Sequence, residues 1–259
     1  MLPMAKHREH IMDQFSRNAD LFATVPVLTS EETLQLLVRL SGATPEDVAL
    51  DVACGAGVVA CAFAATVKHA TGLDLVPAMI DRARALAAEK QLANVSWREG
   101  EAVPLPFADE SFSIVTSRYT FHHFENPRGV LTEMKRVCQH GGRILVADMQ
   151  ASEEPMKAAA LNRMERLRDP SHARAMPLTE LQSLFRSLDL APAEPVFHRL
   201  EFEVETLLQG SHPLPGDDAK VRRLFENSLE DDGMALQVRR EAGRIQFSYP
   251  IAVLVARRP

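Results

Sequence analysis

Short apolar runs alternate with helix-like segments through the middle of the chain. Five runs read as strands: "DVALDVA", "VKHATGLDL", "NVSWREG", "SFSIVTS" and "RILVADM". Several are separated by segments whose apolar residues repeat at the helical period, as Met79, Ile80, Ala83 and Leu86 do. Strand–helix–strand units of this kind fold as a parallel sheet with helices on both faces. The sequence therefore predicts an α/β, doubly wound, Rossmann-like fold.

The alternation loosens after Met149. Residues 153–168, 178–189 and 217–229 read as helices, and two late runs, "VFHRLEFEV" and "IQFSYPIAVLVARR", read as strands. Because no strand–helix–strand rhythm joins these two strands, we expect them to pair antiparallel at the edge of the sheet. The predicted fold has a seven-stranded, mostly parallel sheet with an antiparallel edge strand and a helical lid.

Composition excludes several classes of protein. The chain has 259 residues, a formal net charge of -6 and a pI near 5.9, which argues against nucleic acid as a partner. No window has the run of about 20 apolar residues that spans a membrane, and the charged start "MLPMAKHREHIMDQF" is unlike a signal peptide. We therefore expect a cytoplasmic protein without a membrane span. The three cysteines lack C-x-x-C spacing, so we expect neither disulfides nor a metal site.

A glycine-rich loop follows the first strand, in "LDVACGAGVVA" (residues 50–60). Gly55, Gly57 and Ala60 fit the pattern G-x-G-x-x-G/A of a dinucleotide loop. However, the carboxylate of Asp51 just before the loop would repel a pyrophosphate at the helix N-terminus. The loop therefore favours a ligand with positive charge, and a nicotinamide-dependent oxidoreductase stays open as the alternative.

Acidic residues follow the next two strands. In a doubly wound sheet, ligands bind beyond the carboxyl ends of the strands. Asp74 ends the second strand, 17 residues past Gly57, near the spacing at which an acid accepts ribose hydroxyls. Glu101 follows the third strand as an acceptor for an exocyclic amine, and the apolar segment from Ala102 can pack on a purine. A nucleoside that carries a cationic group would give each of these side chains a favourable contact.

Residues 47–149 resemble a class I S-adenosylmethionine-dependent methyltransferase. The string "LPFADESFSIVTSRYTFHHFENPRGVLTEMKRVCQHGGRILVADM" is similar to the ubiquinone/menaquinone-biosynthesis type of that family, methyltransferase type 11. The dense resemblance covers about 40% of the chain, and "QFSRNADLF" matches more loosely. It implies S-adenosylmethionine as cofactor, S-adenosylhomocysteine as product, and methyl transfer to an O, N, C or S nucleophile of a small-molecule substrate.

The resemblance also implies which residues hold the cofactor. Asp51 and the loop to Gly57 would surround the methionine part, Asp74 would bind the ribose, and Ser117 and Arg118 would line the methionine end. The full cofactor-binding set is Phe22, Asp51, Ala53, Cys54, Gly55, Gly57, Asp74, Leu75, Met79, Glu101, Ala102, Ser117 and Arg118. Ala53 departs from the family, which usually has Gly there; we expect binding to survive because alanine is small.

Two adjacent histidines follow the fourth strand. Each alone reads equally well as a buttress of the short helix there. Because strands four and five should be neighbours, His122 and Asp148 can meet over the cofactor as a catalytic base and the carboxylate that orients it. The predicted substrate contacts are Tyr119, His123, His172 and Arg174.

The chain divides into three predicted regions: an N-terminal lid segment (1–29), a cofactor-binding core (30–150), and a segment of substrate-cover helices and final strands of the same sheet (151–259). Besides the oxidoreductase, a non-catalytic cofactor-binding protein of the same fold stays open, since fold alone does not imply turnover. The sequence predicts no oligomeric state.

Overall fold

A nine-stranded sheet runs through the computed structural model, which describes residues 3–259. Its main path has the order β3-β2-β1-β4-β5-β9-β7. These strands are β1 (Val48–Val52), β2 (His69–Asp74), β3 (Val95–Glu99), β4 (Phe112–Arg118), β5 (Cys138–Ala151), β7 (Val196–Glu203) and β9 (Arg244–Arg257). The short strands β6 (Met176–Pro177) and β8 (Arg239–Glu241) pair with β5 and β9. The α/β fold and its seven principal strands are as predicted.

Strand β9 runs antiparallel to β5 and β7, its neighbours on the main path, and to the short strand β8. The remaining pairs, β1 with β2 and β4, β2 with β3, and β4 with β5, are parallel. The antiparallel strand therefore lies one place inside the edge, which β7 forms. The sequence explains this order: the buried run "IAVLVA" of β9 suits a strand with two neighbours, whereas exposed and less exposed residues alternate along β7.

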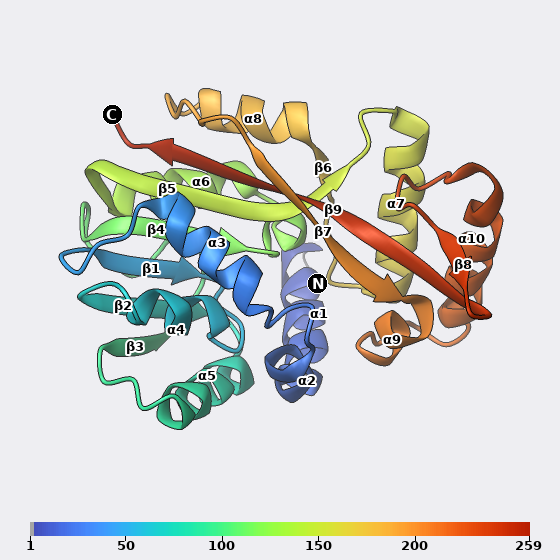
Figure 1. Cartoon of the computed structure of the whole chain (residues 1–259), viewed down its shortest axis with the longest axis horizontal. Coiled ribbons are helices and arrows are strands. Elements are labelled where there is room, and N and C mark those ends of the chain that lie inside the picture. The colour runs from blue at the N-terminus through green and yellow to red at the C-terminus, as the bar shows by residue number, and fades with distance from the viewer. Residues whose placement is uncertain (1–2) are drawn as a thin grey trace.

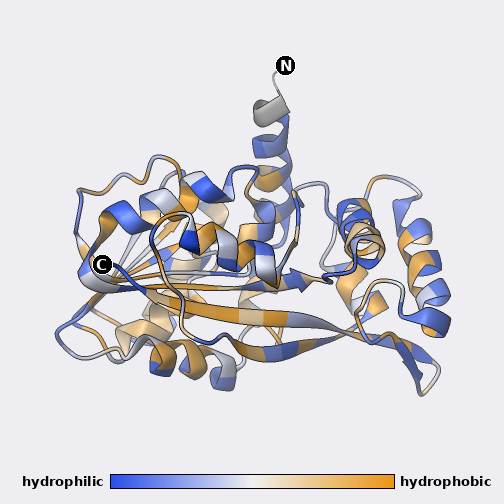
Figure 2. Cartoon of the chain, turned by 90° about the horizontal axis from the view of Figure 1, so that it is seen from above, coloured by the Kyte–Doolittle hydropathy of each residue, from blue (hydrophilic) through white to orange (hydrophobic). Residues whose placement is uncertain are grey.

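Helices cover both faces of the sheet (Figure 1). Helices α3 (Glu31–Ser41) and α4 (Val58–Ala64) pack on one face, with α5 (Pro77–Glu89) beside α4. Helices α6 (Pro127–Val137) and α8 (Leu178–Arg186) pack on the other. Adjacent β4 residues Ile114 and Val115 belong to the two opposite cores, as the alternation of side chains along a strand requires. Figure 2 shows the apolar strands between the helical layers.

Two groups of helices lie beyond the strand ends. Helices α1 (Pro3–Arg17) and α2 (Ala19–Thr24) lie near the middle of the molecule (Figure 1). Helices α7 (Pro155–Arg168), α9 (Val204–Gln209) and α10 (Asp217–Asp231) gather around the far parts of β7 and β9, over a separate apolar core. No helix within residues 3–259 has the length and apolar character needed to cross a membrane.

The predicted helices and strands are present with small shifts at their ends. Sequence analysis missed β6, β8 and α9, which have two, three and six residues. Segments this short contain too few residues to show a periodic pattern.

Gly57 is constrained by packing against β3. Its φ is +81°, and a Cβ added there would lie 2.5 Å from the Trp97 ring and 2.7 Å from the Ala83 side chain. Both atoms belong to the packed interior, so the loop needs a residue without a side chain at this point.

We predict that Gly57→Ala lowers the free energy of unfolding by about 1–3 kcal/mol through overpacking, in addition to its backbone strain. Gly141→Ala is the matched control, because its φ is +71° and no atom lies within 4 Å of the added Cβ. Urea unfolding of both variants gives the comparison. Equal losses would contradict the role of the Trp97 contact.

Candidate functional site

A cavity of about 450 Å³ opens beyond the carboxyl ends of β1, β2 and β4, where the order of the strands reverses. Ligands bind at this point in doubly wound sheets, and the volume suits a molecule of drug-like size. Most of the predicted cofactor-binding residues line this first cavity: Phe22, Asp51, Ala53, Cys54, Gly55, Asp74, Leu75, Met79, Glu101, Ala102 and Arg118.

The glycine loop curves around one side of this cavity through left-handed backbone angles. Ala53, Gly55 and Gly57 have φ values of +55°, +52° and +81°. Ala53 therefore carries a side chain in a conformation that costs a residue with a Cβ about 1–2 kcal/mol. A Cβ on Gly55 would have no protein atom within 4 Å, and Gly55 lines the cavity. The loop thus leaves open space where a ligand can approach its backbone.

Asp74 ties this loop to the end of β2. Its Oδ2 accepts a hydrogen bond from the Gly55 N–H at 2.8 Å, and its Oδ1 accepts one from the Val76 N–H at 2.9 Å. Burial raises the pKa of Asp74, against the opposing effect of these backbone donors. Since a carboxylate oxygen can accept two hydrogen bonds, each oxygen keeps a free position for a ligand hydroxyl.

Asp51 and Arg118 both line this cavity, and each has one buried polar atom without a hydrogen-bond partner among the described residues. Asp51 is 3% exposed, and its Oδ2 has no hydrogen-bond partner among the described residues. Burial raises the pKa of Asp51 to about 7, although Arg118 acts to lower it. The Arg118 Nη2 donates to the Leu28 carbonyl at 2.8 Å, whereas Nη1 lacks a partner within the described chain. A ligand with both an ammonium and a carboxylate group would satisfy both atoms.

A second cavity, of about 140 Å³, adjoins the first. The two share five wall residues: Phe15, Phe22, Leu28, Tyr119 and His123. His122 and Asp148 line the second cavity only. These shared side chains form the boundary across which two bound molecules would face each other.

The predicted contact between His122 and Asp148 is present. His122 Nδ1 lies 2.7 Å from Asp148 Oδ1, and the His122 backbone N–H donates to Oδ2 at 2.8 Å. Because the carboxylate accepts, Nδ1 carries the hydrogen and Nε2 is the nitrogen left for another molecule. Burial acts to lower the pKa of His122, but the neighbouring Asp148 outweighs it and raises that pKa.

The neighbouring histidine has the opposite electrostatic environment. His123 Nδ1 donates to the Ser171 carbonyl at 3.0 Å. Burial, together with the charge of His122, lowers the pKa of His123 to about 4. At neutral pH, His123 is therefore an uncharged side chain at the boundary between the two cavities.

Comparison with known proteins assigns the family. The methyltransferase-domain family matches residues 50–146. An uncharacterized methyltransferase of Bacillus subtilis, YcgJ, is 38% identical over 177 residues, which cover 68% of this chain and 70% of YcgJ. The chain belongs to this methyltransferase family. The resemblance seen in the sequence is confirmed, and methyl transfer is the class of reaction.

Further similarities agree with this methyltransferase assignment. The 2-phytyl-1,4-naphtoquinone methyltransferase of Synechococcus elongatus is 32% identical over 129 residues, covering 47% of this chain and 54% of that protein. The crystal structure of YcgJ has a TM-score of 0.81 at 29% identity and covers 88% of this chain and 99% of its own. A geranyl diphosphate C-methyltransferase from Streptomyces coelicolor, solved with S-adenosylhomocysteine, shares the fold (TM-score 0.62, 16% identity, 88% and 78% covered).

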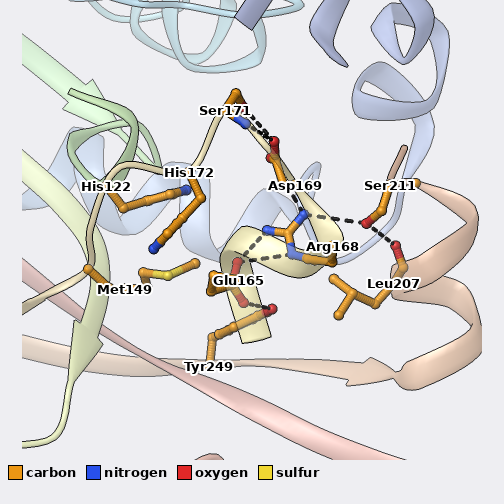
Figure 3. Close-up of polar contacts among 12 residues, drawn as sticks. His122, Met149, Glu165, Arg168, Asp169, Ser171, His172, Leu207, Ser211 and Tyr249 are labelled. Carbon is orange, nitrogen blue, oxygen red and sulfur yellow. Dashed lines mark hydrogen bonds and ion pairs between the residues drawn. The ribbon is translucent and has the colours of Figure 1, made fainter. Parts of the chain in front are cut away.

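Four of the predicted site residues of this methyltransferase line neither of the two cavities: Gly57, Ser117, His172 and Arg174. Ser117 is fully buried, and its hydroxyl donates to the Val52 carbonyl at 3.0 Å. Arg174 forms a surface ion pair with Glu180 on α8. His172 packs beside His122 (Figure 3). Its Nε2 bonds Asn162 on α7 at 2.8 Å. These three side chains, like Gly57, are used in packing and hydrogen bonds within the protein.

Two features of the site were missed in the sequence. The N-terminal helix adds His7, Arg8, Ile11 and Phe15 to the first cavity, and Arg8 pairs with Glu101 at 3.2 Å. A buried network on α7 borders the second cavity, where Arg168 binds Glu165 and Glu165 accepts from Tyr249 (Figure 3). The segment "NRMERLRD" reads as a solvated helix face, so nothing in its pattern indicated a buried ion pair.

Proposed function

We propose that this methyltransferase binds S-adenosylmethionine in the first cavity and methylates a small-molecule acceptor, releasing S-adenosylhomocysteine. The observation that carries the proposal is that Asp51 Oδ2 and Arg118 Nη1 are buried and have no hydrogen-bond partner within residues 3–259. An amino-acid group supplies the ammonium and the carboxylate that these two atoms lack. The C-methyltransferase with the same fold, solved with S-adenosylhomocysteine, supports the choice of ligand.

The remaining walls fit the nucleoside part of that ligand. Asp74 would accept the two ribose hydroxyls with the free positions of its oxygens. Glu101 would accept the adenine amine, with Leu75 and Ala102 on either side of the base. Met79 and Phe22 add apolar wall, and the backbone from Ala53 through Cys54 to Gly55 would follow the methionine part. A nicotinamide dinucleotide would instead place its pyrophosphate near Asp51, where the carboxylate disfavours it.

The three regions of the chain would have separate tasks in this proposal. Residues 30–150 bind the cofactor, and residues 151–259 supply much of the second cavity. Residues 1–29 act as the lid: the Arg8–Glu101 pair and the hydrogen bond from His7 Nε2 to the His123 carbonyl (2.7 Å) hold α1 over the first cavity. The cytoplasmic location stays a prediction from the sequence.

The protein would contribute alignment, exclusion of water and a base to catalysis. When bound, S-adenosylmethionine supplies a methyl group made electrophilic by its positively charged sulfur. The buried walls keep water from competing with the acceptor. The uncharged His123 avoids repulsion with that positive charge, and His122, oriented by Asp148, would take a proton from an acceptor that needs to lose one.

We predict that Asp74→Asn weakens binding of S-adenosylhomocysteine about tenfold or more, because charge-assisted hydrogen bonds contribute about 1.5–3 kcal/mol each. Isothermal titration calorimetry measures this affinity, with NAD as a comparison ligand expected not to bind. Asp81→Asn is the control, since Asp81 is an exposed acid on α5. Unchanged affinity in a folded Asp74→Asn variant would remove Asp74 from the site.

We predict that His122→Ala lowers kcat by about 10²–10⁴-fold while cofactor affinity stays the same. The wild-type rate should rise with pH through a pKa above 6.5, because only neutral His122 accepts a proton and Asp148 raises its pKa. The assay follows S-adenosylhomocysteine formation from pH 5 to 9 with a panel of small alcohols, phenols, amines and thiols.

The His122→Ala, Asp148→Asn double variant should be little slower than His122→Ala, because the two residues act as one unit. A pH dependence that persists in His122→Ala would contradict the role as base.

A further inference from the structure

The second cavity lies where an acceptor must sit. It shares Phe15, Phe22, Leu28, Tyr119 and His123 with the first cavity, so the two cavities lie side by side. In-line displacement requires the nucleophile to approach the methyl group directly. The second cavity adjoins the proposed cofactor site, so it is the candidate position for the acceptor.

The size of the second cavity and the side chains in its wall restrict which acceptors can bind there. The cavity holds about 140 Å³, close to the volume of about 150 Å³ that takes up benzene in an apolar protein core. Five aromatic rings belong to its wall, those of Phe15, Phe22, Tyr119, Phe202 and Tyr249. Leu200, Leu207, Met149 and Ile251 add apolar surface. A single aromatic ring matches both the volume and the wall.

The charged groups at this cavity are already paired. Arg168 donates to Glu165 Oε2 through Nε at 2.9 Å and Nη2 at 2.7 Å, and its Nη1 lies 3.7 Å from Asp169 (Figure 3). Asp169 accepts from the Ser171 backbone N–H at 2.8 Å and from its hydroxyl. Asp148 accepts hydrogen bonds from the backbone N–H and from Nδ1 of His122. A charged acceptor would lose its hydration shell and gain no free opposite charge in return.

One ring nitrogen is left for the acceptor. Asp148 fixes the hydrogen of His122 on Nδ1, and the hydrogen bonds that His122 forms to Asp148 use Nδ1 and the backbone N–H, not Nε2. A neutral imidazole nitrogen accepts a hydrogen bond from a hydroxyl group. Phenols ionise near pH 10, as tyrosine does, far more readily than aliphatic alcohols, so an imidazole accepts their proton more easily.

From these observations, and resting on the proposed function, we propose that the second cavity is the acceptor site and that it selects an uncharged phenol with a single ring. The phenol proton moves to His122 Nε2, and the resulting imidazolium is stabilised by Asp148. The phenol oxygen forms the new bond to the methyl carbon while the carbon–sulfur bond breaks, and its electron pair remains on sulfur. The products are an aryl methyl ether, S-adenosylhomocysteine and a proton that His122 later releases to solvent.

Calorimetry on the whole chain saturated with S-adenosylhomocysteine tests the proposal, with phenol, benzoate and benzylammonium as probes of similar size. Phenol should bind about tenfold or more tightly than either charged probe, because only phenol enters without an unpaired charge. Mass spectrometry with S-adenosylmethionine and phenol should detect anisole.

A cavity-filling variant locates the binding site. Leu200→Phe narrows only the second cavity, so phenol affinity should fall about fivefold or more while S-adenosylhomocysteine affinity is retained. Phe197→Leu is the matched control on the same strand, because Phe197 is 57% exposed.

The outcomes separate the two proposals. Absence of S-adenosylhomocysteine binding would overturn the proposed function and the acceptor site together. Normal S-adenosylhomocysteine binding with stronger binding of benzoate or benzylammonium than of phenol would overturn the acceptor site alone. Phenol binding that Leu200→Phe leaves unchanged would also overturn it.

Discussion

Strands β2, β1 and β4 run parallel, so their carboxyl ends meet at one edge of the sheet. The chain leaves β1 and β4 toward opposite faces, since α4 packs on one face and α6 on the other. Within residues 3–259, no helix that connects two strands covers the point between them, and the first cavity opens there. The residues that end these strands therefore lie around the first cavity, and the chemistry of the site depends on which residues they are.

Burying the charged residues at these strand ends costs free energy when no ligand is bound. Asp51 and Asp74 both have raised pKa values because of burial, and burial lowers the pKa of Arg118. Asp74 recovers part of the desolvation energy from two backbone donors, whereas Asp51 and Arg118 each keep a polar atom without a partner among the described residues. Buried charges are normally paired. The simplest physical account is a ligand that carries the complementary charges.

The sequence predicted the parts of the fold and the site that depend on local pattern and strand order. Asp74 and Glu101 follow consecutive strands, and His122 and Asp148 follow neighbouring ones, so their proximity is a consequence of the topology. The two late strands pair antiparallel at the edge of the sheet, as predicted. Their order, with β9 inside β7, was not predicted, because it depends on which of the two strands has neighbours on both sides.

Other features depend on contacts between distant segments. The contact of Gly57 with Trp97, the approach of Arg8 to Glu101 and the hydrogen bond from Tyr249 to Glu165 have no signature in any short stretch. His172 and Arg174 fall in a loop whose path the pattern does not specify, and the loop turns them away from both cavities.

In the proposed function, Asp51 and Arg118 hold the amino-acid end of the cofactor. Calorimetry of S-adenosylhomocysteine and adenosine with the wild type and Arg118→Met tests it most directly, since adenosine lacks that end and methionine keeps the apolar stem of the side chain. The account predicts that Arg118→Met weakens S-adenosylhomocysteine about tenfold or more and leaves adenosine unchanged. An equal loss for both ligands, or no loss for S-adenosylhomocysteine, would contradict it.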